Sequence, residues 1–264
     1  MKRTLGAALV AIIATALVAG CGSSTTEDSG ATTTSGAAPV TGEITVFAAA
    51  SLKSTFGELG RQFEQQHPGT TVKLNFAGSS DLVAQLTQGA PGDVFASADT
   101  ANMTKATDAG LVAGTPVDFA TNTLTIVTPP GNPAHIETFA DLARPDAQVV
   151  VCAPQVPCGA ATKKIETATG TTLHPVSEES SVTDVLGKVT SGQADAGLVY
   201  VTDAAGAGAK VTTVAFPESA GAVNTYPIAT LKASGNPVAA QEFVALVTGD
   251  DGRKVLSAAG FAAP

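Results

Sequence analysis

The chain has 264 residues, 44% of them hydrophobic, which is enough for one two-lobed protein or two modest domains. It carries 14 basic and 23 acidic residues, a formal charge of −9 at pH 7, and this balance argues against nucleic acid as a partner. The same charge repels anions at long range, so an anion site in this chain would depend on local hydrogen-bond donors.

The first twenty residues have the pattern of a signal peptide. Lys2 and Arg3 precede an apolar run over 5–19, which is too short to span a bilayer comfortably. The run ends in VAGC (18–21), which resembles the bacterial lipobox, a motif cut before its cysteine so that the cysteine carries lipid. We expect a signal peptide over 1–20 and a lipidated Cys21 at the outer face of the cell membrane; a plain secretory signal is the alternative. Its removal takes away two cations and no acid, changing the formal charge from −9 to −11.

The segment after Cys21 is polar and has no apolar periodicity. Residues 22–39 are mostly Ser, Thr, Gly and Ala with two acids. We expect residues 21–42 to form the lipidated cysteine and a flexible tether, with a span of roughly 20–25 Å for the Gly/Ser-type chain.

Two further cysteines, Cys152 and Cys158, bracket a loop that contains two prolines. In an oxidising compartment this pair predicts a disulfide, which would add roughly 2–2.5 kcal/mol in the loop-entropy model. The alternative, a metal site built on two thiolates, lacks a nearby His or a further Cys.

The stretch 44–63 predicts a strand that runs directly into a helix. Residues 44–47 are β-branched or aromatic, as in a buried strand, and Ser51 falls where a helix N-cap belongs. Such a junction presents unsatisfied N–H groups at the positive end of the helix dipole and favours an anion. A single junction of this kind, taken alone, is more simply explained as an ordinary capped helix without a ligand. The apolar residues at helical spacing are Leu52, Phe56, Leu59 and Phe63.

A second junction of this kind follows. The predicted strand 71–76 runs into GSSD (78–81) and then into a helix that Gly89 terminates. The next predicted elements are a strand over 94–96, a helix over 100–109 ended by Gly110, a strand over 123–128 and a helix near 138–143.

The second half of the chain contains two more junctions. The predicted strand 148–152 leads through the cysteine loop into a helix over 159–169, and Ser181 precedes a helix that starts at Val182. Asn236 caps a later helix with Pro237 at its first position. The remaining predicted elements are strands over 196–201, 211–216 and 226–231 and a final helix over 250–259.

Strands that alternate with helices predict parallel sheets flanked by helices, an α/β fold. The glycines form neither a G-x-G-x-x-G pattern nor a P-loop, so a nucleotide site is unsupported. No G-x-S-x-G elbow is present, and a serine hydrolase would need a histidine beside Ser51 or Ser79. Each histidine instead lies at or near a turn proline, so we expect no enzyme. The three histidines are His67, His135 and His174.

Four segments resemble the molybdate-binding lipoproteins of ABC importers, and the resemblance covers nearly all of 44–261. The segments are VFAAASL (46–52), FAGSS (76–80), GAPGDVFASAD (89–99) and GLVY (197–200).

The resemblance implies a type II periplasmic-binding-protein fold, with two lobes joined by crossing hinge strands. Each lobe would be a mostly parallel sheet flanked by helices. Residues 43–122 plus 217–264 would form lobe 1, and 123–216 lobe 2.

The resemblance also implies which residues bind the oxyanion. Ser51 and Ser79 would donate from hydroxyl and backbone N–H groups, Cys158 and Val182 from backbone N–H groups, and Tyr200 from its hydroxyl. The family often has Ala where this chain has Cys158, but a backbone donor does not depend on its side chain. A subset of the family lacks the tyrosine.

The implied function is capture of molybdate, and of tungstate, for delivery to the permease and ATPase subunits of an ABC importer. We expect a monomer without a cofactor, and molybdenum only as the bound oxyanion, with no direct protein–metal ligand. The alternatives are a receptor for sulfate or another tetrahedral oxyanion, a secreted serine hydrolase and a purely structural surface lipoprotein.

Overall fold

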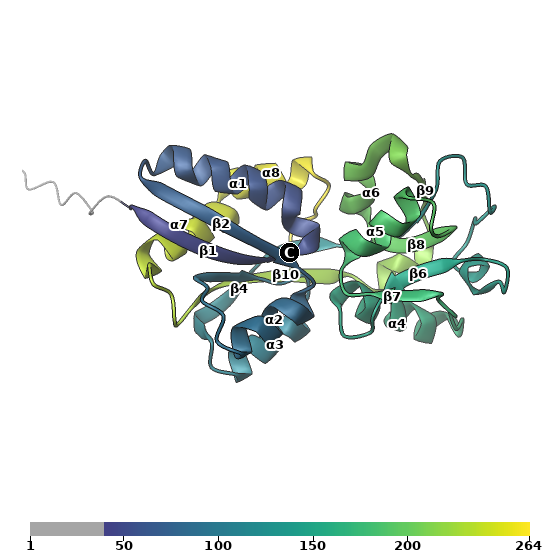
Figure 1. Ribbon diagram of the computed structural model, residues 1–264, viewed down its shortest axis with the longest axis horizontal. Coiled ribbons are helices and arrows are strands. Elements are labelled where there is room, and N and C mark those ends of the chain that lie inside the picture. Colours follow the sequence, from purple (N-terminus) through teal and green to yellow (C-terminus); the bar gives the residue numbers. More distant parts are fainter. Residues whose placement is uncertain (1–39) are drawn as a thin grey trace, which may run out of the picture. The chain divides into compact units, whose positions relative to one another are not determined.

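The computed structural model describes residues 40–264, so the predicted signal peptide, Cys21 and most of the predicted tether lie outside the described residues. Residues 40–264 form two α/β lobes, each built on a five-stranded sheet (Figure 1). None of the helices in this part of the chain is both long and apolar enough to cross a membrane.

The sheet of lobe 1 has four strands in one direction and one reversed. β1 is parallel to β2 and β3, whereas β10 is antiparallel to its neighbours β3 and β4. The spatial order is β2 (Thr70–Ala77), β1 (Gly42–Ala49), β3 (Val94–Ala96), β10 (Asn224–Leu231) and β4 (Val112–Asn122).

Helices cover both faces of this sheet (Figure 1). On one face Phe56 and Phe63 of α1 pack their rings against Phe243 of α7, with centroids 6.0 and 5.5 Å apart. The periodic apolar residues of the sequence therefore form the core of this layer. One face carries α1 (Lys53–Gln66), α7 (Pro237–Thr248) and α8 (Asp250–Ala258), and the other α2 (Ser79–Thr87) and α3 (Thr100–Asp108).

Lobe 2 has the same plan on a single apolar core. β6 is parallel to β7 and β8, and β5 is antiparallel to β8 and β9, so one strand of five is again reversed. The strands in spatial order are β7 (Ser177–Glu179), β6 (Val149–Cys152), β8 (Ala196–Tyr200), β5 (Leu124–Thr128) and β9 (Thr212–Val214). The helices are α4 (Pro157–Thr169), α5 (Val182–Thr190) and α6 (Val201–Ala207).

The chain crosses between the lobes twice. Only Thr123 separates β4 of lobe 1 from β5 of lobe 2, and the chain returns through the turn Pro217–Gly221 into β10. At the first crossing the Asn122 side-chain amide donates to the Thr202 hydroxyl at 2.8 Å. The predicted two-lobed α/β fold with crossing strands is thus confirmed.

Several elements differ from the sequence predictions, among them strand β7 and helix α6, which were not predicted. The long strand β4 was not predicted, because Gly114 and Pro116 interrupt its apolar pattern. The helix expected near 138–143 is a short 3₁₀ turn over Ala140–Ala143, since Pro145 disfavours helical backbone at Arg144. The strand expected to reach 201 ends at Tyr200 and runs directly into α6.

Candidate functional site

A small cavity lies between the lobes. None of its lining residues carries a charge, and all five predicted ligand residues are among them. Lobe 1 contributes Ala49, Ala50, Ser51, Gly78, Ser79 and Ala98. Lobe 2 contributes Val156, Pro157, Cys158, Val182 and Tyr200.

Ser51 lies in a 3₁₀ turn over Ala50–Leu52, one residue before the N-cap of α1, so its predicted role as the N-cap is wrong. Its hydroxyl instead lies 3.1 Å from the hydroxyl of Tyr226. Burial raises the pKa of Tyr226, which keeps this phenol protonated and able to donate. When Tyr226 donates in this pair, the Ser51 proton is left for an acceptor in the cavity.

Ser79 is the first residue of α2, and Gly78 is its N-cap. The Ser79 hydroxyl accepts the Ala98 N–H at 2.9 Å, which leaves the hydroxyl proton available. The first backbone bonds of this helix run from Asp81 and Leu82 to the Gly78 carbonyl, so the Ser79 N–H precedes the helical ladder. This end of α2 therefore offers both a hydroxyl and an amide donor.

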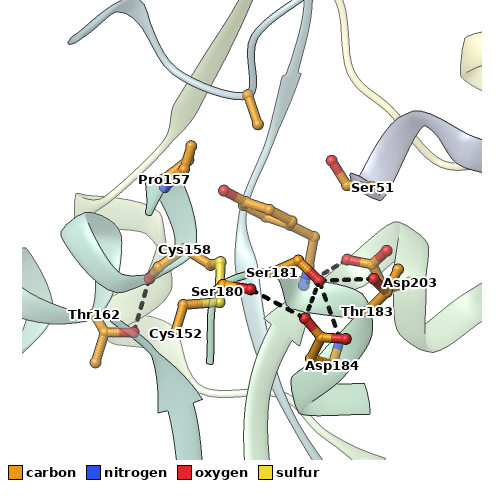
Figure 2. The surroundings of a disulfide bond; sticks show 12 residues. Ser51, Cys152, Pro157, Cys158, Thr162, Ser180, Ser181, Thr183, Asp184 and Asp203 are labelled. Carbon is orange, nitrogen blue, oxygen red and sulfur yellow. Dashed lines mark hydrogen bonds between the residues drawn. A yellow bond between two sulfur atoms is a disulfide. The ribbon is translucent and has the colours of Figure 1, made fainter. Parts of the chain in front are cut away.

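The predicted disulfide between Cys152 and Cys158 is present (Figure 2). It ties the end of β6 to the second residue of α4. The first backbone bond into this helix is donated by Ala160 to the Val156 carbonyl at 2.9 Å, so the Cys158 N–H precedes it.

Ser181 caps α5 with its side chain. Its hydroxyl donates to the Asp184 carboxylate at 2.7 Å, accepts the Asp184 N–H and pairs with Thr183 (Figure 2). These bonds occupy the hydroxyl fully. Val182, the first residue of the helix, lines the cavity, and its N–H precedes the first helical bonds, which Asp184 and Val185 donate to the Ser181 carbonyl. Ser181 itself shapes the loop.

Tyr200 closes the site at the end of β8. Its side chain is 1% exposed, yet its hydroxyl has no hydrogen-bond partner within residues 40–264. Burial raises the pKa of Tyr200 well above its ordinary value, with further contributions from Tyr226, Asp99 and Asp203. A neutral phenol without a partner, at the wall of an uncharged cavity, can donate its proton in a hydrogen bond to an acceptor bound in that cavity.

Asp203 is the acid closest to Tyr200 in the sequence, and it accepts the Tyr200 N–H at 3.1 Å. Burial raises the pKa of Asp203 to about 7, although the Tyr200 N–H opposes this shift.

The two lobes touch beside the cavity. The Asn224 side-chain amide of lobe 1 donates to the Ala98 carbonyl at 2.8 Å and reaches the Pro157 carbonyl of lobe 2 at 3.5 Å. At Gly78 an added Cβ would lie 2.1 Å from the Ser180 carbonyl oxygen of lobe 2. Only a glycine therefore permits this approach of the lobes.

Sequence reasoning missed Asn224 and Tyr226 as parts of the site. Tyr226 is one of only two tyrosines in the chain, which is the one sequence signal that singles it out. Nothing in the local sequence marks Asn224, because its partners are more than sixty residues away along the chain.

The sequence profile of the family described as "Bacterial extracellular solute-binding protein" matches residues 44–262. The chain belongs to this family. It is therefore an extracytoplasmic solute-binding protein, and its two-lobed fold is the fold of its relatives.

Individual relatives agree with this assignment. The chain is 56% identical to the molybdate-binding protein ModA of Mycobacterium tuberculosis over 260 residues, covering 98% of each chain. Among solved structures, the substrate-binding domain of a putative molybdenum ABC transporter from Clostridium difficile matches with a TM-score of 0.61 and 26% identity, covering 85% of this chain and 100% of that one. The periplasmic molybdate-binding protein of Azotobacter vinelandii matches with a TM-score of 0.72 and 24% identity, covering 84% and 99%.

Proposed function

We propose that this solute-binding protein captures molybdate, and with it tungstate, in the cavity between its lobes and delivers it to an ABC importer. The observation that carries the proposal is the donor set of the cavity: hydroxyl and N–H groups from both lobes converge there without a charged side chain. The relative at 56% identity, named as a molybdate-binding protein, supports the choice of anion.

Each predicted residue receives one role. Ser51 and Ser79 donate from lobe 1; the Cys158 and Val182 N–H groups and the Tyr200 hydroxyl donate from lobe 2. Molybdenum is held only through its oxygens, with no direct bond to the protein. Because donors from both lobes meet one dianion, the ligand favours the closed arrangement and drives closure.

The energetics are sufficient for a receptor. A hydrogen bond to a charged oxygen contributes roughly 1.5–3 kcal/mol. Several such bonds, less the free energy of closure, give about −8 to −12 kcal/mol, which is micromolar to nanomolar affinity. A site of neutral donors thus binds a dianion although the described residues carry a net negative charge.

The donor set also determines selectivity. Protonated phosphate brings an O–H that needs an acceptor, and a cavity of donors leaves this group unpaired. Sulfate has the right charge but is smaller, so the donors cannot all reach its oxygens. Molybdate and tungstate are close in size and charge, so we expect little discrimination between them.

The proposal also includes where the protein lies in the cell and which proteins it meets there. Cys21 anchors the protein by lipid to the outer face of the membrane, and the tether lets the folded part reach the permease and ATPase subunits. The protein acts as a monomer and performs no chemistry on its ligand. Lobe 1 comprises 43–122 and 217–264, and lobe 2 comprises 123–216.

The test is isothermal titration calorimetry of the wild-type protein with molybdate, tungstate, sulfate and phosphate. Ser51→Ala should weaken molybdate binding by about 1–3 kcal/mol, because it removes one bond to a charged acceptor. Ser257→Ala, at an exposed site on α8, is the matched control and should bind as the wild type does. Unchanged affinity in Ser51→Ala would contradict the assignment, and sulfate binding as tight as molybdate binding would reject the size argument.

A further inference from the structure

A second, larger cleft opens beside the cavity and shares Ala50 and Ser51 with it. One wall is α1 of lobe 1, and the other is formed by α5, α6 and the 3₁₀ turn Gly208–Lys210 of lobe 2. The cleft is therefore an open space between the lobes that leads to the Ser51 side of the cavity.

The net charge of the residues that line this cleft is positive, whereas the net charge of the whole protein is negative. Its charged lining residues are three cations, Lys53, Arg61 and Lys210, and one acid, Asp203. Arg61 is paired with Glu58 at 2.6 Å, whereas Lys53 and Lys210 form no ion pair with any residue in 40–264. Two unpaired ammonium groups thus face one cleft from opposite lobes.

Lys53 lies close to the cavity without lining it, and Lys210 lines the cleft that adjoins the cavity. Lys53 is two residues from Ser51, so their Cα atoms are at most ~7 Å apart. The Debye length is about 8 Å at physiological ionic strength and about 30 Å at 10 mM, so both charges act on an anion in the cleft. An ammonium on a flexible stem attracts an anion while it stays hydrated, and it does not fix the anion in one geometry.

A dianion approaching this protein meets the repulsion of its net negative charge, and none of the residues that line the cavity carries a charge to attract it. We propose that the cleft lined by Lys53 and Lys210 is an anion-collecting vestibule, where the tetrahedral oxyanion is first held before it passes Ser51 into the cavity. This inference rests on the proposed function of the cavity and adds a first, weaker binding step before it. The vestibule sets the association rate, and the neutral donors set the dissociation rate.

The test compares association kinetics in a double variant, Lys53→Gln with Lys210→Gln. Stopped-flow tyrosine fluorescence follows molybdate binding. The chain has no tryptophan to mask this signal, and its two tyrosines, Tyr200 and Tyr226, are buried at or beside the cavity. At ~10 mM ionic strength the variant should associate about tenfold more slowly than the wild type, and at ~300 mM about twofold or less more slowly. The dissociation rate should stay within twofold of the wild type.

The matched control is the double variant Lys164→Gln with Lys232→Gln. These lysines are also exposed, one in each lobe, and form no ion pair with any described residue, so the control has the same net charge. It should associate within about twofold of the wild type at both ionic strengths, because its lysines lie outside the cleft.

Equal association rates in the two double variants would overturn the vestibule and leave molybdate binding intact. A faster dissociation rate in the Lys53/Lys210 variant, without slower association, would also overturn it, because the lysines would then contact the bound anion. If wild-type protein shows no molybdate binding by calorimetry, the proposed function fails and the vestibule fails with it.

Discussion

Gly78→Ala tests whether close contact between the lobes is needed for binding. Gly78 has φ −61° and ψ 142°, a backbone conformation that alanine adopts freely, so the substitution introduces no backbone strain. The added Cβ would nevertheless lie 2.1 Å from the Ser180 carbonyl oxygen, whereas real Cβ contacts essentially never fall below 3.0 Å. The lobes must therefore separate by about 1 Å at this point.

This separation moves the donors of lobe 2 away from those of lobe 1. Ser180 is two residues from Val182, whose N–H is a proposed ligand, so the displacement acts directly on the site. A bond of ~2.9 Å that lengthens by about 1 Å is no longer a hydrogen bond. Loss of two bonds to charged oxygens, at roughly 1.5–3 kcal/mol each, weakens molybdate binding by at least about a hundredfold.

Calorimetry measures this effect, and thermal unfolding without ligand controls for the fold. Gly235→Ala is the matched control, because an added Cβ there meets nothing within 4 Å. We expect Gly78→Ala to keep its ligand-free melting temperature and to lose affinity, while Gly235→Ala keeps both. A Gly78→Ala protein whose Kd lies within threefold of the wild-type value would refute the reasoning.

Three further outcomes are expected. Tyr200→Phe removes a buried hydroxyl without a partner, so ligand-free stability should hold or rise while molybdate affinity falls by about 1–3 kcal/mol; a fall in both would contradict the donor role. Replacing Cys152 and Cys158 with serine should lower the free energy of unfolding by about 2 kcal/mol in urea titrations, and no change would show that the bridge does not constrain the unfolded chain. Burial raises the pKa of Asp203 from 3.8 to about 7, so its contribution to stability is complete below pH 4 and is lost as the pH rises through 7. Thermal unfolding at pH 5 and pH 8 should therefore show a smaller loss of stability in Asp203→Asn than in the wild type, and equal losses would contradict the shift.

The sequence predicts the parts of the site that depend on local structure. The strand–helix junctions at Ser51, Ser79, Cys158 and Val182 follow from apolar periodicity and from the glycines and serines between the elements. These junctions come together because the strands of each sheet end at the same edge, where helix N-termini gather.

The parts that depend on distant contacts are not predictable in this way. The Ser51 hydroxyl pairs with Tyr226, which lies 175 residues further along the chain. Ser51 therefore makes a tertiary contact where the local sequence predicted a helix cap. The contact between Gly78 and Ser180 likewise exists only once the lobes meet. Strand β4 escaped detection because pairing with β10 stabilises it despite Gly114 and Pro116.

A crystal structure of the protein with bound molybdate tests most directly the claim that neutral donors suffice for a dianion. We expect the anion in the cavity between the lobes, with its oxygens accepting from Ser51, Ser79, Cys158, Val182 and Tyr200 and with no lysine or arginine in contact. Molybdate bound elsewhere, or held in the cavity by a lysine or arginine side chain, would contradict the claim.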